Sequence, residues 1–228
     1  MNLDTQNFDH LIKNLERTSF NNSIFNYKSG RKAFLSLGKG NIHEWIEALL
    51  PNTRIILEPK IIGSSIGIQY INGELSKAIN ELSKDITKDI QLLKIIPNTI
   101  PIKKRIEIRG ILYEKSNLSK KDKKMNLFCK QKASSKLNEL NFCAFHIFHC
   151  KINQFQTLRE LEKLNFEIPE SHFTNYTSDI EIYRQCWREG KLFQKYPTSG
   201  IVLKINSKKL QKHLGENNLS IHWAYAIN

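Results

Sequence analysis

The stretch LEPKIIG at residues 57–63 places a single lysine, Lys60, between strand-forming apolar residues. Pro59 precedes this lysine, and Gly63 allows the chain to turn shortly after it. An amine held at the end of a buried strand can act as a nucleophile, because burial lowers the pKa of lysine and the neutral amine is the attacking form. The alternative is a structural role, in which the aliphatic stem packs on the strand and the ammonium group reaches water.

The pattern of apolar residues around Lys60 predicts both strands and helices. Strands are predicted at residues 54–60, 64–79 (as a hairpin), 104–115, 141–150, 199–206 and 220–227, and helices at residues 8–15, 41–50, 84–96, 157–164, 179–190 and 208–214. Asn72 and Gly73 have the residue types of a two-residue hairpin turn. Thr157 and Glu160 have the spacing of a capping box, which predicts that a helix opens there.

The order of these elements predicts the fold class. Strands and helices mix without the regular strand–helix–strand rhythm that produces a parallel sheet. We therefore predict an α+β fold with mostly antiparallel sheets flanked by helices. The chain shows no internal repeat and no linker that would divide this fold.

The charge of the chain favours an anionic partner. The 228 residues carry a formal net charge of +13, and the segment at residues 115–136 alone contains eight lysines. Such a field attracts nucleic acid or the phosphates of a nucleotide. Two alternatives remain at this point, a lysine-rich composition that serves solubility and a solvated loop at residues 115–136.

The cysteines and histidines give no metal-binding pattern. Cys129, Cys143, Cys150 and Cys186 form no C-x-x-C pair, so we expect free thiols and no zinc. His146 and His149 lie three apart in an apolar strand, which predicts side chains on opposite faces, packed rather than metal-bound. Trp45, Trp187 and Trp223 are expected in the core.

The chain also lacks the features of a membrane or secreted protein. No run of about 18 apolar residues is present, so we expect no membrane-spanning helix and no membrane partner. The N-terminus MNLDTQNFDH lacks the basic start and apolar stretch of a signal peptide. We therefore expect a cytoplasmic location.

Several stretches in the same order resemble the adenylation (nucleotidyltransferase) domain of NAD-dependent DNA ligases. They are FLSLGKGNIHEWI, LEPKIIGSSIGIQYINGELSKAI, IEIRGILY, SGIVLKIN and LGENNLSIHWAYAI. The resemblance covers residues 34–228 and implies a nucleotidyltransferase fold, with antiparallel sheets, flanking helices and a central nucleotide cleft. Residues 1–33 would form an N-terminal helical segment, as a remnant or a cap.

The resemblance implies roles for individual residues. Lys60 takes the place of the lysine that attacks the α-phosphorus of NAD and forms a lysine-AMP adduct, and Lys204 that of a second lysine beside this phosphate. Nucleotide-binding places fall to Glu58, Gly63, Ser36, Leu37, Arg109 and Lys191, the last of which replaces an arginine. The implied cofactors are NAD, through its AMP moiety, and Mg²⁺ if the site is active.

The chain departs from the family pattern at four positions. The family motifs K-x-D-G, R-G-E and D-G-V-V-x-K read here as KIIG, RGI and SGIVLK, so Ile62, Ile111 and Ser199 stand where the family has carboxylates. Asn228 stands in the place of a later lysine. Because carboxylates in such a pocket would hold metal water or orient the ribose, their loss argues against catalysis.

These observations leave three hypotheses. The first is a degenerate adenylation domain that binds nucleotide or nucleic acid, with DNA repair or replication as the related processes. The second is an active lysine adenylyltransferase that uses NAD, alone or as part of a split ligase. The third is an interaction scaffold for a protein partner, whose pocket is filled by Ile62 and Ile111. We expect none of the additional modules with which ligases of this family encircle DNA. Whether the chain is an enzyme therefore stays an open question at this point.

Overall fold

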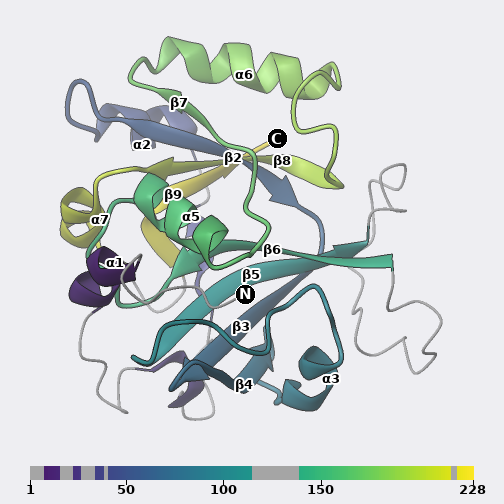
Figure 1. The fold of residues 1–228 in the computed structure, drawn as a ribbon. Coiled ribbons are helices and arrows are strands. Elements are labelled where there is room, and N and C mark those ends of the chain that lie inside the picture. The colour runs from purple at the N-terminus through teal and green to yellow at the C-terminus, as the bar shows by residue number, and fades with distance from the viewer. Residues whose placement is uncertain (1–7, 16–22, 27–33, 39–40, 115–138, 217–219) are drawn as a thin grey trace.

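The computed structural model describes residues 8–15, 23–26, 34–38, 41–114, 139–216 and 220–228. The lysine-rich stretch at residues 115–136 and Cys129 lie outside this part of the chain. The described residues form two sheets joined by β2 and its continuation into β3 (Figure 1). The predicted α+β class with mostly antiparallel sheets is confirmed.

The two sheets contain the strands predicted from the sequence and two short strands that were not predicted. The first sheet, in the order β1-β9-β8-β2-β7, contains β1 (Ser36–Gly38), β2 (Ile55–Ile61), β7 (His172–Thr174), β8 (Thr198–Ile205) and β9 (Ser220–Ile227). The second sheet, in the order β4-β3-β5-β6, contains β3 (Ser64–Ile71), β4 (Glu74–Asn80), β5 (Ile106–Glu114) and β6 (Leu140–Ile147). Within these sheets only β1 and β9 pair in parallel.

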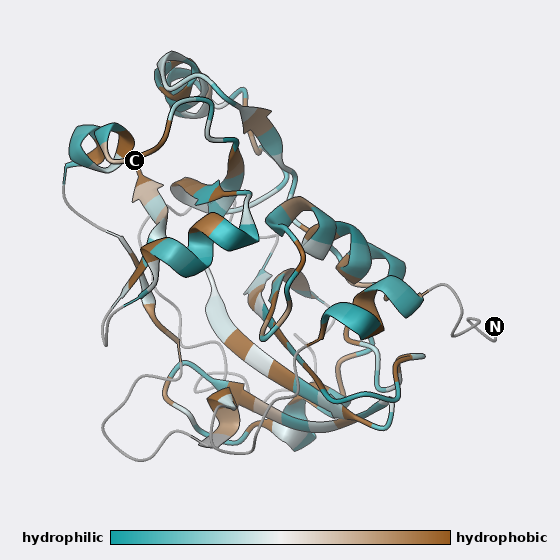
Figure 2. Cartoon of the chain, turned by 90° about the vertical axis from the view of Figure 1, so that its left-hand side faces the viewer, coloured by the Kyte–Doolittle hydropathy of each residue, from teal (hydrophilic) through white to brown (hydrophobic). Residues whose placement is uncertain are grey.

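The helices are α1 (Asp9–Asn14), the 3-10 helix η3 (Ile24–Asn26), α2 (Ile42–Glu47), α3 (Thr87–Gln91), α5 (Gln154–Lys163), α6 (Ser178–Arg188) and α7 (Lys208–Leu214). Helices α1, α3 and α5 pack on the core of the second sheet and α2 and α6 on the core of the first, whereas η3 and α7 adjoin the cavity between the sheets. Figure 2 shows that the helices are mostly hydrophilic, with shorter hydrophobic stretches between the hydrophilic ones. None of the helices in the described residues is both long and apolar enough to cross a bilayer.

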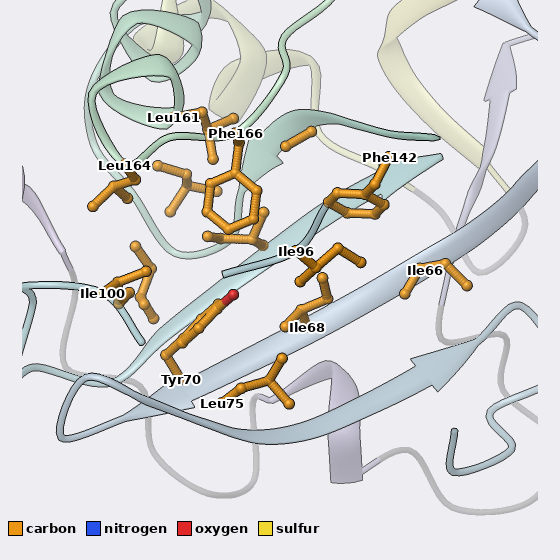
Figure 3. Packing of buried hydrophobic residues seen from close by; sticks show 14 of the residues in the cluster. Ile66, Ile68, Tyr70, Leu75, Ile96, Ile100, Phe142, Leu161, Leu164 and Phe166 are labelled. Carbon is orange, nitrogen blue, oxygen red and sulfur yellow. The ribbon is translucent and has the colours of Figure 1, made fainter. Parts of the chain in front are cut away.

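The main core lies under the second sheet. Even-numbered residues of β3, such as Ile66, Ile68 and Tyr70, point to this side because successive side chains of a strand alternate between its faces. Figure 3 shows these side chains meeting Phe142 of β6 and residues of α5 and the segment after it. Tyr70 also donates a hydrogen bond from its hydroxyl to the carbonyl oxygen of Pro97 at 2.6 Å. Consequently the odd-numbered residues of β3 and β5 point away from this core, toward the opposite side of the second sheet.

A second core packs the first sheet against α2 and α6. Ile55 and Leu57 of β2 and Leu203 of β8 point to this side. Trp45 and Trp187, which we expected in the core, are half-buried at its edge. The opposite, even-numbered face of β2 is thereby directed away from both helices.

The hairpin and the cysteines follow the sequence predictions. Asn72 and Gly73 have positive φ angles of 54° and 85°, as a type I′ turn between β3 and β4 requires. Cys143 and Cys150 are buried free thiols, and Cys186 is a free thiol of intermediate burial.

The start of α5 differs from the prediction. We expected this helix to open at Thr157 and Glu160, but it begins at Gln154 with a capping box formed by Asn153 and Gln156. Asparagine and glutamine supply the same two reciprocal bonds as the threonine and glutamate pair, so the earlier pair takes the role. The predicted helix at residues 84–96 is also shorter, because only Thr87–Gln91 is helical.

Truncating Ile68 to alanine should destabilise the main core. Ile68 is fully buried in this core, and the cavity left by its side chain should lower the free energy of unfolding by about 2–5 kcal/mol in urea titrations. Leu92→Ala is the matched control, because Leu92 is 69% exposed and its truncation should change stability by less than about 0.5 kcal/mol. Equal losses in the two variants would contradict this assignment of the core.

Candidate functional site

A cavity of about 630 Å³ opens between the two sheets, on the face of each sheet that lies opposite the two hydrophobic cores described above. Its walls come from β2, β8 and β9 of the first sheet, from β5 and β6 of the second, and from α7. Five cationic side chains line it, Lys60, Arg109, Lys204, Lys208 and Lys212, against two carboxylates, Glu58 and Glu216. The wall is therefore strongly positive, which suits an anionic ligand.

The pairing of β2 with β8 brings three charged residues to one face. Glu58 and Lys60 are two residues apart on β2, so they share a face. Val202 of β8 lies opposite Glu58, and Lys204 lies opposite Ile56. Glu58 and Lys204 are thus diagonal neighbours on the cavity side of the sheet. Long side chains can bridge the distance between two such positions.

Glu58 and Lys204 form a buried ion pair. The Nζ of Lys204 lies 2.6 Å from the Oε2 of Glu58, and the two side chains are 6% and 3% exposed. The other carboxylate oxygen, Oε1, accepts a hydrogen bond from Nε2 of Gln154 at 3.1 Å. The same amide nitrogen donates to the carbonyl oxygen of Phe145 at 3.0 Å. Both oxygens of Glu58 are therefore engaged by protein groups.

The ring of Phe145 lies between two of the cations. The Nζ of Lys204 lies 4.5 Å from the ring centroid, and the guanidinium carbon of Arg109 lies 5.6 Å from it. Arg109 also lies over Phe34, at 4.7 Å. Burial lowers the pKa of Arg109 to about 10, so its guanidinium is still charged at neutral pH. The two rings thus hold the arginine as a cation at the cavity wall.

Lys60 contacts the end of β9. Its Nζ lies 3.2 Å from the Oδ1 of Asn228. The main-chain oxygen of Asn228 accepts hydrogen bonds from Arg184 at 2.7 Å and from Arg188 at 3.1 Å, both on α6. This network fixes Asn228 beside the amine of Lys60.

Ile62 and Ile111, at the positions where the resemblance led us to expect carboxylates, bring no polar side-chain atom to the site. Ile111 lines the cavity from β5, and its Cγ2 would lie 2.6 Å from a Cβ added at Gly63. That Cβ would also lie 2.3 Å from the main-chain oxygen of Leu112, so glycine is required where β2 leads into β3. Ile62 donates its main-chain N–H to the oxygen of Pro197 at 2.7 Å.

Of the other residues singled out in the sequence, Ser36, Lys191 and Ser199 lie outside the cavity wall. Ser36 pairs with Ser220 where β1 meets β9, while its neighbour Leu37 lines the cavity. Lys191 is 70% exposed and lies 2.6 Å from Glu189. Ser199 precedes Gly200, whose φ of 144° allows the close approach of β8 to β9. Among the described residues, the cavity wall thus contains Glu58, Lys60, Arg109, Lys204, Leu37 and Ile111 of the predicted set.

The two histidines correct one prediction. We expected His146 and His149 on opposite faces of a strand, but both line the cavity, because β6 ends at Ile147 and His149 lies in a turn with a φ of 53°. His146 stacks on Trp223 at a centroid distance of 5.8 Å. Burial, followed by the charge of Lys208, lowers the pKa of His146 well below its ordinary value, so the ring is neutral at pH 7.

The carboxylates of the cavity fit a metal ion poorly. Mg²⁺ prefers an octahedron of oxygen ligands, usually with one or two carboxylates. Glu58 is committed to Lys204 and Gln154, and isoleucine stands at position 111. No group of three potential metal ligands occurs among the residues that the structure describes.

Sequence reasoning missed several contributors to this site, among them Lys208 and Lys212 of α7, Gln154 and Phe145. Gln154 carries no signal in the sequence, because its contact with Glu58 joins residues 96 positions apart. Phe145 was recognised only as part of a buried strand, although an aromatic residue among apolar neighbours on a strand could have suggested a ring at the cavity wall.

Comparison with protein families gives a match to the NAD-dependent DNA ligase adenylation domain over residues 32–130. A DNA ligase of Metamycoplasma arthritidis is 30% identical, in an alignment that covers 85% of this chain and 34% of that protein. A DNA ligase of Fervidobacterium nodosum is 26% identical, over 82% of this chain and 31% of that protein. The chain thus spans about a third of the length of these curated relatives.

Solved structures share the fold. A mycobacterial DNA ligase D complexed with ATP and MES has a TM-score of 0.51 at 11% identity, over 78% of this chain and 55% of that chain. A Lig E DNA ligase has a TM-score of 0.50 at 12% identity, over 85% of this chain and 68% of that chain. The match at residues 32–130 and the curated relatives place the protein with the adenylation domains of NAD-dependent DNA ligases.

Proposed function

We propose that this protein is a degenerate adenylation-domain-like protein that binds an adenine nucleotide in its cavity without transferring AMP to Lys60. The observation that carries the proposal is the charge of the cavity wall, in which five cations face two carboxylates and one of these carboxylates, Glu58, is already neutralised by Lys204. The surplus positive charge supports binding of phosphate groups.

The same wall argues against catalysis. Transfer of a phosphoryl-type group needs metal ions and cations placed against the charge that develops on the phosphate oxygens. Ile111 in the wall and Ile62 beside Lys60 cannot bind a metal or its water. When several members of one catalytic group are missing, the remaining members recover little of the rate.

The alternative is an active enzyme that uses NAD, alone or with another chain. Lys60 favours it, because this lysine lines the cavity on the same strand face as Glu58 and close to Lys204. The second binding partner to consider is nucleic acid, which the net charge of +13 favours.

A test for a covalent AMP adduct separates the proposal from the active alternative. The protein is incubated with NAD or ATP and Mg²⁺, and its intact mass is measured. We expect no gain of one AMP, because the carboxylates that would support the transfer are absent from positions 62 and 111. Lys60→Ala serves as the control, and an adduct that forms on the wild type but not on this variant would overturn the proposal.

The Glu58–Lys204 ion pair should be strongly coupled. Lys204→Met should lower the free energy of unfolding by about 3–5 kcal/mol, because it leaves the Glu58 carboxylate buried without its partner. The double variant Glu58→Gln/Lys204→Met should lose much less than the sum of the single variants, as a double-mutant cycle in urea would show. Additive losses would mean that the two side chains do not interact in solution.

Binding to nicked duplex DNA should depend on salt. Each phosphate contact made by a lysine releases counterions, so the logarithm of the affinity should fall linearly with the logarithm of the salt concentration. Lys208→Gln/Lys212→Gln on α7 should make this slope shallower by about 1–2 units, and the exposed Lys163→Gln on α5 is the matched control. Affinity that does not change with salt would exclude a phosphate-binding role for this wall.

If the wild type binds neither nucleotide nor DNA, the interaction scaffold is the remaining hypothesis. Ile111 then belongs to a wall that fills space rather than one that receives a ligand.

A further inference from the structure

We propose that residues 23–26 and 34–37 form one wall of the cavity, here called the N-terminal wall, and that the buried carboxylate of Glu107 holds this wall in place. Glu107 thereby acts as a positioning residue for the nucleotide, without lining the cavity itself. The inference rests on the proposed nucleotide binding for its effect on affinity, but the anchoring by Glu107 can be measured without any ligand.

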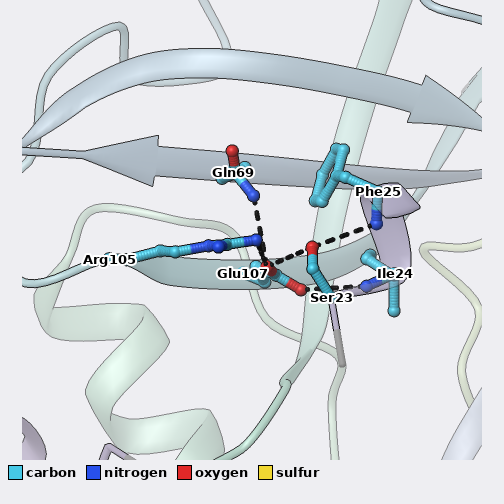
Figure 4. Close-up of polar contacts among 6 residues, drawn as sticks. All are labelled: Ser23, Ile24, Phe25, Gln69, Arg105 and Glu107. Atoms are coloured by element: carbon cyan, nitrogen blue, oxygen red, sulfur yellow. Dashed lines mark hydrogen bonds and ion pairs between the residues drawn. The ribbon is translucent and has the colours of Figure 1, made fainter. Parts of the chain in front are cut away.

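Glu107 is the polar centre of the contact between β5 and the N-terminal wall. Its side chain is 2% exposed and lies on the odd-numbered face of β5, away from the main core. Oε1 accepts a hydrogen bond from the hydroxyl of Ser23 at 2.7 Å, and Oε2 accepts one from the main-chain N–H of Ile24 at 3.3 Å. Figure 4 shows both contacts at the start of η3. One carboxylate thus fixes both the side chain and the backbone of this segment.

Two further donors hold the carboxylate itself. Arg105 lies 2.6 Å from Oε1 and Gln69 lies 3.2 Å from the same atom (Figure 4). Because a buried carboxylate is costly unless it is paired and hydrogen-bonded, these contacts stabilise Glu107 in the position from which it reaches Ser23 and Ile24. The carboxylate therefore cannot move away from the wall without losing several bonds at once.

The wall also fits the surface of the second sheet closely. Ile24 and Phe34 are buried together with Ile79 of β4. A Cβ added at Gly67 of β3 would lie 2.8 Å from the Cδ1 of Ile24 and 2.9 Å from the Cζ of Phe34. Because Gly67 has no side chain, Ile24 and Phe34 of the N-terminal wall can pack directly on β3.

The wall then reaches the cavity at two places. Ile24, Leu35 and Leu37 contribute apolar surface to its lining. Phe34 stacks on the guanidinium of Arg109, whose other neighbouring ring is Phe145. Displacing the wall would enlarge the cavity and release one of the two rings that orient this cation. Both changes would lower the affinity for a ligand that contacts Arg109.

The test combines a ligand-free measurement with a binding measurement. In Glu107→Gln, hydrogen exchange at the amides of Ile24 and Phe25 should become at least about tenfold faster, because charge-assisted bonds that protect the segment are lost. The affinity for AMP, measured by calorimetry, should weaken by about tenfold. In the wild type, saturating AMP should slow exchange at Ile24. Ser23→Ala removes one bond only and should give smaller changes in the same direction.

Glu160→Gln is the matched control. Glu160 is also buried and pairs with a basic residue, Lys163 on α5, but it lies in neither the wall nor the cavity lining. This variant should change neither the exchange at Ile24 nor the AMP affinity, whatever it does to overall stability. If Glu107→Gln and Glu160→Gln changed the exchange at Ile24 and the AMP affinity equally, Glu107 would contribute only to overall stability and the proposal would be wrong.

The remaining outcomes are distinct. Unchanged exchange at Ile24 in Glu107→Gln would overturn the anchoring role of Glu107. Faster exchange with unchanged AMP affinity would overturn the role of the wall in binding. If the wild type binds no AMP, the proposed function fails together with the effect of the wall on affinity, and the exchange result alone then decides whether Glu107 anchors the wall.

Discussion

The buried ion pair between Glu58 and Lys204 is the contact on which the rest of the site depends. Two charges removed from water must be matched closely in geometry, because neither can be left alone in a low-dielectric environment. The match requires β2 and β8 to pair in one register, with Lys204 diagonal to Glu58. A shift of β8 by one residue would turn Lys204 to the opposite face, into the apolar core against α6, and would leave Glu58 without its partner. The same register directs Lys60 toward the cavity.

The cavity combines a cationic wall with apolar residues such as Ile111, whose side chain offers no oxygen to a metal or a ribose. Arg109, held between two aromatic rings, and Lys204, paired with Glu58, are fixed by contacts made within the protein. The cations are therefore preorganised before any ligand arrives, which lowers the conformational cost of binding an anion.

Much of the frame around Lys60 could be predicted from the sequence. Alternation along residues 54–60 and 199–206 predicts strands, and a period of two places Glu58 and Lys60 on one face. The pairing of β2 with β8 could not be derived from these patterns, and neither could Gln154, whose contact with Glu58 spans 96 positions. His149 was misplaced because a residue beyond the last strand residue, Ile147, no longer follows the alternation of the strand. Local patterns predict faces, whereas long-range pairing decides which faces meet.

Cations and carboxylates would act at different points of the free-energy profile of AMP transfer. Under the proposed function, Lys204 and Arg109 would attract phosphate charge that a nucleotide already carries in the ground state, so they would contribute to binding before any transfer begins. Ground-state binding of this kind raises affinity without by itself raising the rate of the chemical step. Metal ligands and groups that orient the reacting atoms contribute mainly in the transition state. Under the proposed function, a site that holds these cations and has isoleucine at positions 62 and 111 would bind a nucleotide without supporting the transfer.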